Sequence, residues 1–176
     1  TNGGVSFTKV ADLPVNQFYE IGINMNNPEK LYGGTQDNGT LRTQTGALDD
    51  WDRIWGGDGF YVIVTPNSNP TEIYAESQFG NLVKSNNDGD YFYYCMDGIG
   101  GEPTNWSTPV AMDPNNYNVL YYGTDRVYRT ENSAGYWNSI SDDLTDGIPG
   151  TRLGTVTTIG VSPANSDIIW AGTDDS

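Results

Sequence analysis

The residues of this sequence that could carry chemistry are carboxylates and aromatic side chains placed in short turns. Asp37 follows one predicted strand, and Asp58 lies in a Gly-Gly-Asp-Gly segment before the next unit of the chain. Paired carboxylates divide the acid and base roles in glycoside hydrolysis, so these two are the candidate catalytic residues. Trp106 lies in a connection outside the repeated positions, where its ring could stack on a sugar face.

The other candidates are polar side chains in turns at the same end of the predicted strands. Turn formation is the alternative interpretation for the Asp and Asn residues among them, Asp37 included, because tight turns require these residue types. Asp58 is less easily explained in this way, since its flanking glycines would already make the turn. Glu76 replaces a glycine that the other units place there. The candidate ligand-binding residues are Asn38, Glu76, Gln78, Trp106, Asp125 and Asp174.

Composition excludes several classes of chemistry. The sequence has 8 Lys and Arg against 23 Asp and Glu, a net charge of −15, and no basic stripe that would bind nucleic acid. It has no His, which excludes Ser-His and Cys-His catalysis and His-based metal sites. A structural cation stays open, although no segment matches an EF-hand, and no cofactor is expected. No apolar run approaches the roughly 18 residues that a membrane span needs.

The sequence repeats, and the repeat predicts the elements that position these residues. Each unit pairs a strand such as Ile21–Met25 with a following strand such as Leu31–Thr35. Equivalent positions are Gly34, Glu76, Gly123 and Gly172, which gives steps of 42, 47 and 49 residues. A repeat of about 40 to 50 residues built from short strands is typical of a β-propeller. We therefore predict an all-β fold, a propeller segment of about 3.5 four-stranded blades.

Each unit reads as four strands, A to D from inner to outer, joined by turns. In the second unit we expect strand A at 61–65, B at 72–76, C at 81–84 and D at 91–96. A proline-bearing turn separates A from B, because proline cannot donate to a strand ladder. Strand alternation gathers the B–C turns and D–A connections, which hold the candidate residues, on one face. The predicted units are about 17–59, 60–107, 108–154 and 155–176, with residues 1–16 ending a preceding blade.

The predicted C–D turns carry the pattern Ser/Thr-x-Asp/Asn-x-Gly-x-x-Trp/Phe. It occurs in Ser85–Phe92 and Thr130–Trp137, incompletely in Thr1–Phe7, and stretched in Thr43–Trp51. Asx and hydroxyl side chains bond the backbone of such turns, and glycine permits positive φ. The pattern resembles the Asp-box, which is a folding device. A structural role is therefore expected for Asn2, Asn87, Asn132, Trp137 and Phe92.

Two further residues are expected in the core. Cys95 is the single cysteine and lies in a strand-like apolar run; with no His available as a base, we expect a buried structural thiol. Trp170 aligns with Tyr32, Tyr74 and Tyr122 on strand B, and is expected to pack in the core as they do.

Several segments together resemble the bacterial BNR/Asp-box propellers, which are sortilin-like or VPS10-like proteins often labelled glycosyl hydrolases. The segments are 33–40, 56–61, 74–81, 120–129 and 171–175, and the likeness spans essentially the whole chain. The resemblance implies a bacterial protein that is secreted or exposed at the cell surface. More distantly, Gly57-Asp58-Gly59-Phe60 is similar to a loop of twin-propeller xyloglucanases, which would make Asp58 the base and Asp37 or Asp174 the other carboxylate.

Three functions stay open. The first is a propeller module that binds a glycan or protein partner on the B–C/D–A face, the second a polysaccharide-cleaving glycoside hydrolase of the xyloglucanase type, and the third a structural spacer in a surface assembly. Stacked blades expose sheet faces and edges that invite association, so we expect these 176 residues not to be a stable monomer alone. The expected partners are the ligand and remaining blades from the same polypeptide or another subunit.

Overall fold

The computed structural model describes residues 2–8, 15–147 and 154–175, and their regular structure is all β-strand. None of these residues lies in a helix long and apolar enough to cross a membrane. The strands are β1 (Phe18–Ile23), β2 (Leu31–Thr35), β3 (Gly39–Thr43), β4 (Trp51–Trp55), β5 (Gly59–Val64), β6 (Ile73–Ser77), β7 (Asn81–Ser85), β8 (Tyr93–Tyr94), β9 (Val110–Met112), β10 (Leu120–Gly123), β11 (Val127–Thr130), β12 (Asn138–Ser139), β13 (Val156–Val161) and β14 (Ile169–Thr173).

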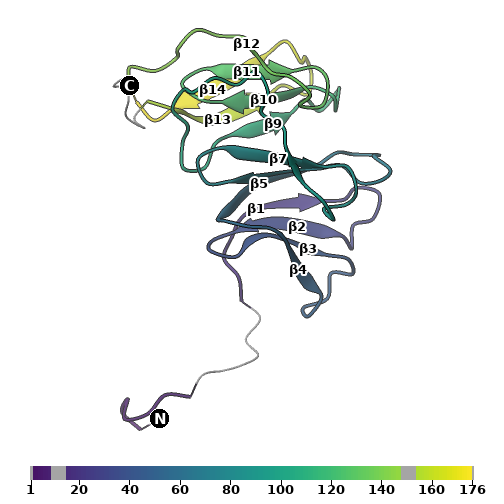
Figure 1. The fold of residues 1–176 in the computed structure, drawn as a ribbon, viewed down its shortest axis with the longest axis vertical. Coiled ribbons are helices and arrows are strands. Elements are labelled where there is room, and N and C mark those ends of the chain that lie inside the picture. The colour runs from purple at the N-terminus through teal and green to yellow at the C-terminus, as the bar shows by residue number, and fades with distance from the viewer. Residues whose placement is uncertain (1, 9–14, 148–153, 176) are drawn as a thin grey trace.

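Consecutive strands pair antiparallel into separate sheets that stack on one another (Figure 1). Blade 1 is β1–β4, blade 2 is β5–β8, blade 3 is β9–β12, and the pair β13–β14 forms half of blade 4. Strand β1 contacts β5, β5 contacts β9, and β9 contacts β13. Strand A is therefore the inner strand of each blade and strand D the outer one, which is the arrangement of a β-propeller and confirms the predicted fold class.

The outer strand of blade 2 is shorter than the expected 91–96. Only Tyr93 and Tyr94 pair with β7. Cys95 leaves the ladder, although its N–H still donates to the carbonyl of Leu82 at 3.3 Å. The Cys95 side chain is buried, as expected, and burial raises the pKa of its thiol to about 12. The thiol is therefore protonated at neutral pH and packs as a small apolar group.

The C–D turns are closed by the hydrogen bonds expected from their sequence. In blade 2, Ser85 Oγ accepts the N–H groups of Asn87 and Gly89 at 3.2 and 2.9 Å, and Asn87 Oδ1 accepts from Ser85 Oγ at 2.8 Å. Thr130 and Asn132 make the same bonds in blade 3. The aromatic residues that end these turns, Phe92 and Trp137, are buried. Local side chain-to-backbone bonding therefore fixes the turns.

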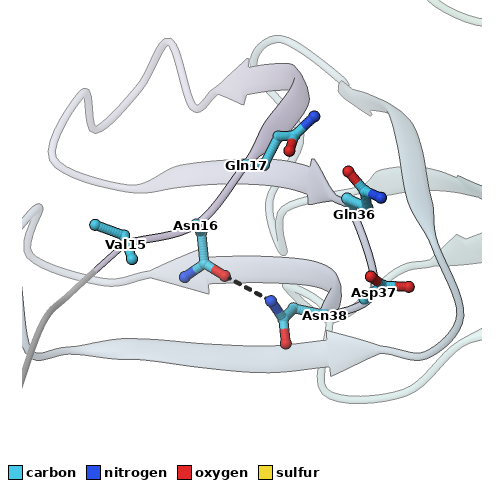
Figure 2. A pocket seen from close by; sticks show the side chains of 6 residues that line it. All are labelled: Val15, Asn16, Gln17, Gln36, Asp37 and Asn38. Atoms are coloured by element: carbon cyan, nitrogen blue, oxygen red, sulfur yellow. Dashed lines mark hydrogen bonds between the residues drawn. The ribbon is translucent and has the colours of Figure 1, made fainter. Parts of the chain in front are cut away.

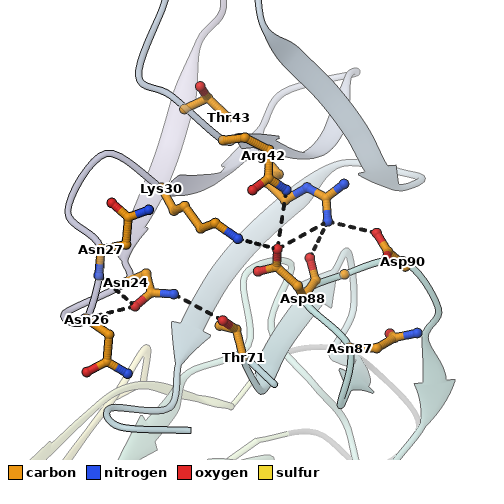
Figure 3. A network of polar contacts seen from close by, with 12 residues as sticks. Asn24, Asn26, Asn27, Lys30, Arg42, Thr43, Thr71, Asn87, Asp88 and Asp90 are labelled. Atoms are coloured by element: carbon orange, nitrogen blue, oxygen red, sulfur yellow. Dashed lines mark hydrogen bonds and ion pairs between the residues drawn. The ribbon is translucent and has the colours of Figure 1, made fainter. Parts of the chain in front are cut away.

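A polar network joins the C–D turn of blade 2 to blade 1 (Figure 3). Lys30 Nζ lies 2.7 Å from Asp88 Oδ2, and Tyr32 Oη donates to Asp88 Oδ1 at 2.5 Å. Arg42 donates to the main-chain carbonyl of Asp88 and, at 3.0 Å, to Asp90 Oδ1. Asp88 has a φ of 66°, a left-handed conformation that Asp tolerates better than most residues. Two cations of blade 1 therefore hold the left-handed turn residue of blade 2.

The same contact recurs one blade further along the chain. Lys84 occupies the strand-C position of Arg42 and donates to the carbonyl of Ser133 at 3.0 Å. Ser133 takes the place of Asp88 in its own turn and has a φ of 57°. Lys84 also pairs with Glu72 at 2.7 Å. Each of these strand-C cations thus fixes the C–D turn of the following blade.

Trp170 does not lie in the core, contrary to expectation. It is the second residue of β14, as Tyr121 is of β10, so its equivalent is Tyr121 and not Tyr122. Tyr121 is 1% exposed beside blade 4, whereas Trp170 is 60% exposed. Among the described residues, no further sheet packs against this side of β14. This side of blade 4 is therefore open to solvent in the part of the chain that the structure describes.

Replacing Asp88 by Asn should destabilise the fold at neutral pH. Partial burial raises the pKa of Asp88, but hydrogen bonds from Lys30, Tyr32 and Gln44 outweigh this effect, so the pKa lies below its usual value. A lowered folded-state pKa stabilises the protein above the unfolded-state pKa, and the gain is lost as pH falls through the folded-state pKa. Urea denaturation should show Asp88→Asn about 1–3 kcal/mol less stable at pH 7, with the difference shrinking towards pH 3.

Asp90→Asn is the matched control, because Asp90 contacts the same arginine but its side chain is 66% exposed. An exposed ion pair contributes about 0–1 kcal/mol, so this variant should unfold close to the wild type. Equal stability of Asp88→Asn and wild type at pH 7 would show that the contacts of Asp88 with Lys30 and Tyr32 do not stabilise the fold.

Candidate functional site

The candidate residues lie on the face formed by B–C turns and D–A connections, here called the loop face. It comprises the turns 36–38, 78–80 and 124–126, the connections 56–58 and 95–109, the described parts 140–147 and 154–155 of the connection to β13, and residues 174–175 after β14. Neighbouring strands are antiparallel, so these segments share one end of the blades. The C–D turns with their cation contacts lie at the other end.

Asp37 and Asp58 lie side by side on the loop face, joined by a hydrogen bond from main chain to side chain. The N–H of Asp37 donates to Asp58 Oδ1 at 2.5 Å, and the N–H of Asp58 donates to Gln78 Oε1 at 2.9 Å. Asp37 has a φ of 61°. Gly57 has a φ of 85°, a backbone conformation that residues with a side chain rarely adopt, so glycine is favoured there. Asp58 therefore links the turns of blades 1 and 2 through its carboxylate and its main chain.

Asp37 and Asn38 also line a shallow depression beside the first strand (Figure 2). Its volume is about 450 Å³. Asn38 Nδ2 donates to Asn16 Oδ1 at 2.9 Å across it. Its lining is rich in amides and has a single carboxylate: Val15, Asn16, Gln17, Gln36, Asp37 and Asn38. The depression offers hydrogen-bonding groups without a cluster of charge.

Glu76 is not available to a ligand, which corrects the expectation from the sequence. Its side chain is fully buried. The carboxyl group accepts the N–H groups of Gly80 at 3.1 Å, Thr108 at 3.2 Å and Tyr61 at 3.5 Å. Burial raises its pKa to about 8 in spite of these hydrogen bonds. Glu76 is therefore a positioning residue that fastens the connection carrying Trp106 to blade 2.

Two of the three glycine equivalents of Glu76, Gly34 and Gly123, lie where the next blade comes too close for a side chain. A Cβ at Gly34 would lie 2.1 Å from the carbonyl oxygen of Phe60, and one at Gly123 would lie 2.9 Å from Val156 Cβ. At blade 2 the Glu76 carboxyl instead meets the main-chain N–H of Thr108. The long connection 95–109 thus gives room for a side chain that the other interfaces exclude.

Trp106 is held in place and still reaches solvent. Its ring makes edge contacts with Phe60 and Phe79 at centroid distances of 5.8 and 4.7 Å. Its carbonyl accepts the N–H of Phe79 at 3.1 Å. The side chain remains 44% exposed. A fixed, partly exposed aromatic ring is a suitable contact for a ligand, because little side-chain entropy remains to be lost.

Asp125 and Asp174 bond mainly to the protein itself. Asp125 is buried and pairs with Arg126, whose Nε lies 2.7 Å from Oδ1. Asp174 is exposed but accepts the N–H and hydroxyl of Thr155 at 2.7 and 3.0 Å, and Asn105 Nδ2 at 3.3 Å. Both residues secure turns, in agreement with the alternative interpretation given above. The exposed members of the candidate set are Asp37, Asn38, Trp106 and Asp174, and of these Asp174 is bonded to Thr155 and Asn105.

Sequence reasoning missed a second depression, of about 560 Å³, at the outer rim of blades 1 and 2. Trp55, Phe79 and Tyr94 line it together with Gln78 and Asn81. One signal in the sequence pointed to it: an aromatic residue in a B–C turn, where turn chemistry favours Asp, Asn or Gly. The other aromatic residues come from outer strands, where nothing in the repeat distinguishes them.

Within residues 2–8, 15–147 and 154–175, no group of three or more His, Cys, Asp or Glu side chains is arranged to hold a metal ion. The chemistry of the loop face is therefore that of aromatic rings, amides and separate carboxylates.

No protein-family model matches the chain, and no curated protein matches it. Solved structures do. A GH74 enzyme from Niastella koreensis superposes with a TM-score of 0.66 at 14% identity, covering 90% of this chain and 26% of that one. The GH74 xyloglucanase from Xanthomonas campestris gives 0.60 at 13% identity, covering 86% and 26%. YCF48 from Cyanidioschyzon merolae gives 0.56 at 14% identity, covering 83% and 47%.

At these identities the likeness establishes the fold alone, a β-propeller. The chain spans about a quarter of the length of the GH74 structures and about half that of YCF48.

The raised pKa of Glu76 makes the stability of the fold depend on pH. Between its ordinary value near 4.5 and about 8, the folded state holds a proton that the unfolded state releases, so stability falls as pH rises through this range. Glu76→Gln removes the titration. The free energy of unfolding of Glu76→Gln minus that of the wild type should therefore be larger at pH 9 than at pH 5, by at least about 1 kcal/mol.

The measurement is urea denaturation at several pH values, with Glu29→Gln as the control because Glu29 is exposed. A difference between Glu76→Gln and wild type that does not vary with pH would contradict the protonated, buried state of Glu76.

Proposed function

We propose that this propeller segment binds a glycan chain on its loop face. The observation that carries the proposal is Trp106, which stays 44% exposed while Phe60 and Phe79 hold its ring at two edges. Aromatic rings supply a large apolar contact at low entropic cost. Asp37 and the amide of Asn38 lie exposed on the same face and offer hydrogen bonds to hydroxyl groups.

The similar structures support a ligand-binding role in general terms. One of them is a xyloglucanase, an enzyme that acts on a polysaccharide, and a YCF48 structure with a TM-score of 0.56 and 14% identity is bound to a D1 peptide. Both a glycan and a peptide therefore fit propellers of this kind. We favour the glycan because the exposed groups of this face are aromatic rings and amides. Export to the cell surface, where such polymers occur, belongs to the same proposal.

Glycoside hydrolysis is the second candidate, favoured by the contact between Asp37 and Asp58. In that scheme Asp58 would act as the base and Asp37 or Asp174 as the acid. Asp174 lies on blade 4 and Asp58 between blades 1 and 2, so the first pair is the closer one. A role as a spacer in a surface assembly, without any ligand, is the third candidate.

Replacing Trp106 by Ala should weaken glycan binding. Affinity electrophoresis of the natural protein in gels containing xyloglucan would measure this. Loss of one aromatic contact should raise the dissociation constant obtained from the retardation about tenfold. Tyr136→Ala is the control, because Tyr136 is 53% exposed but lies in a C–D turn at the other end of blade 3. No binding of the wild type to xyloglucan or to any other glycan would sink the proposal and favour the spacer role.

Hydrolysis is tested separately by the release of reducing sugar from xyloglucan. Asp58→Asn keeps an acceptor for the N–H of Asp37 and removes the charge, so binding should persist in this variant. Release by the wild type that Asp58→Asn abolishes would establish the hydrolase candidate. Binding without release, which we expect, would establish the binding module.

A further inference from the structure

Two depressions on the loop face meet over blade 2. The first, of about 560 Å³, is the aromatic one at the rim of blades 1 and 2, and the second, of about 450 Å³, lies over the connection to blade 3. They share Phe79 and Asn81. The two depressions adjoin at these residues and are together called the blade-2 groove. Its lining residues are Trp55, Gly56, Gly57, Ser77, Gln78, Phe79, Asn81, Tyr94, Gly101, Glu102, Pro103 and Thr104.

Phe79, where the two depressions meet, has an unusual backbone for an aromatic residue. Its φ is 63°, and the equivalent residue of blade 1, Asp37, has a φ of 61°. Asp adopts this conformation readily, whereas a bulky residue there is a genuine outlier. Hydrogen bonds at both main-chain groups maintain it: its N–H donates to Trp106 O at 3.1 Å, and its carbonyl accepts from Thr104 Oγ1 at 2.9 Å. A strained residue that the surroundings hold in place is characteristic of ligand sites.

The groove carries almost no charge, although the protein is strongly acidic. The chain has a net charge of −15, but no residue that lines the first depression is ionisable at neutral pH. Glu102 is the one charged residue of the second, and it accepts from Tyr128 Oη at 2.8 Å and lies 3.8 Å from Arg126 Nε. The groove lacks the several carboxylates that would bind a polycation. A polyanion would be repelled by the net negative charge of the protein. The charge distribution favours a neutral ligand.

The polar groups of the groove match hydroxyl groups. Asn81 Nδ2 donates to the carbonyl of Gln78 at 2.8 Å, and Gln78 Oε1 accepts from Asp58 N. Among the described residues, no hydrogen bond engages the remaining side-chain groups, Asn81 Oδ1 and Gln78 Nε2. One acceptor and one donor thus remain for a ligand, beside the exposed ring of Tyr94, which is 67% exposed.

From these features we infer that the blade-2 groove binds an uncharged polysaccharide strand, with sugar rings against Tyr94 and Trp55 and hydroxyl groups on Gln78 and Asn81. The inference rests on the proposed function and names where on the loop face the glycan lies and what charge it carries. Trp55 is already ordered, because its ring packs against Phe92 at 5.5 Å and against Tyr94 at 6.1 Å. Binding therefore costs little additional ordering of the ring.

The test compares two exposed tyrosines of the same blade. Tyr94 lines the groove, and Tyr91, in the C–D turn at the other end of the blade, is 68% exposed. In the natural protein, Tyr94→Ala should weaken binding to soluble neutral xyloglucan about tenfold, whereas Tyr91→Ala should leave it unchanged. Tyr94→Phe keeps the ring and should retain binding. Carboxymethyl cellulose, a β-glucan that carries carboxylates, should bind at least about tenfold more weakly than xyloglucan.

Each outcome decides one point. Xyloglucan binding that Trp106→Ala weakens but Tyr94→Ala does not would overturn the groove and leave the proposed function intact. Equal affinity for carboxymethyl cellulose would overturn the neutral ligand. Equal losses in Tyr94→Ala and Tyr91→Ala would also overturn the groove, and Asn81→Ala provides an independent second variant, since Asn81 is exposed and should weaken binding without loss of the fold. Absence of all glycan binding would overturn both proposals.

Discussion

A blade of a propeller cannot bury both faces of its own sheet, so strand B of each blade depends on the next blade for its exclusion from water. The second residue of strand B shows this dependence directly. Tyr32, Tyr74 and Tyr121 are at most 1% exposed where a following blade packs against them, and Trp170 is 60% exposed where none does. A cation on strand C makes a second contact with the next blade. Its side chain donates to the carbonyl of the residue that has a left-handed conformation in the next C–D turn.

This stacking leaves one end of the blades free to carry function. The C–D turns are occupied by their own Asx hydrogen bonds and by the cation of the preceding blade, so their geometry is committed to the fold. The loop face is less uniform: the connection between blades 1 and 2 is residues 56–58, whereas the one between blades 2 and 3 is residues 95–109. The longer one brings Trp106 to the surface, and buried Glu76 fastens it to blade 2. The same repeat therefore gives similar C–D turns at one end of the blades and connections of different length at the other.

The repeat, the strands and the C–D turns could be predicted from sequence because they depend on short-range patterns. Strands β6 and β7 pair although only a short turn separates them in sequence, and Ser85 and Asn87 are two residues apart. The burial of Glu76 and the exposure of Trp170 could not be predicted in this way. Each depends on whether residues from outside the blade pack against that side chain. The blade-2 groove escaped for a similar reason: Trp55 and Tyr94 lie on separate outer strands and meet only after the blades have stacked.

The same long-range packing decides which carboxyl groups of this face a substrate could reach. A glycoside hydrolase needs one carboxyl group that keeps its proton near neutral pH, and burial is the usual means of raising the pKa. Here burial has that effect on Glu76, whose pKa is about 8, but the same burial seals Glu76 from any substrate. Asp58 and Asp37 are closer to solvent, and each contributes to a turn through a main-chain hydrogen bond. A raised carboxyl pKa and access for a substrate are therefore separate requirements, and Glu76 meets only the first.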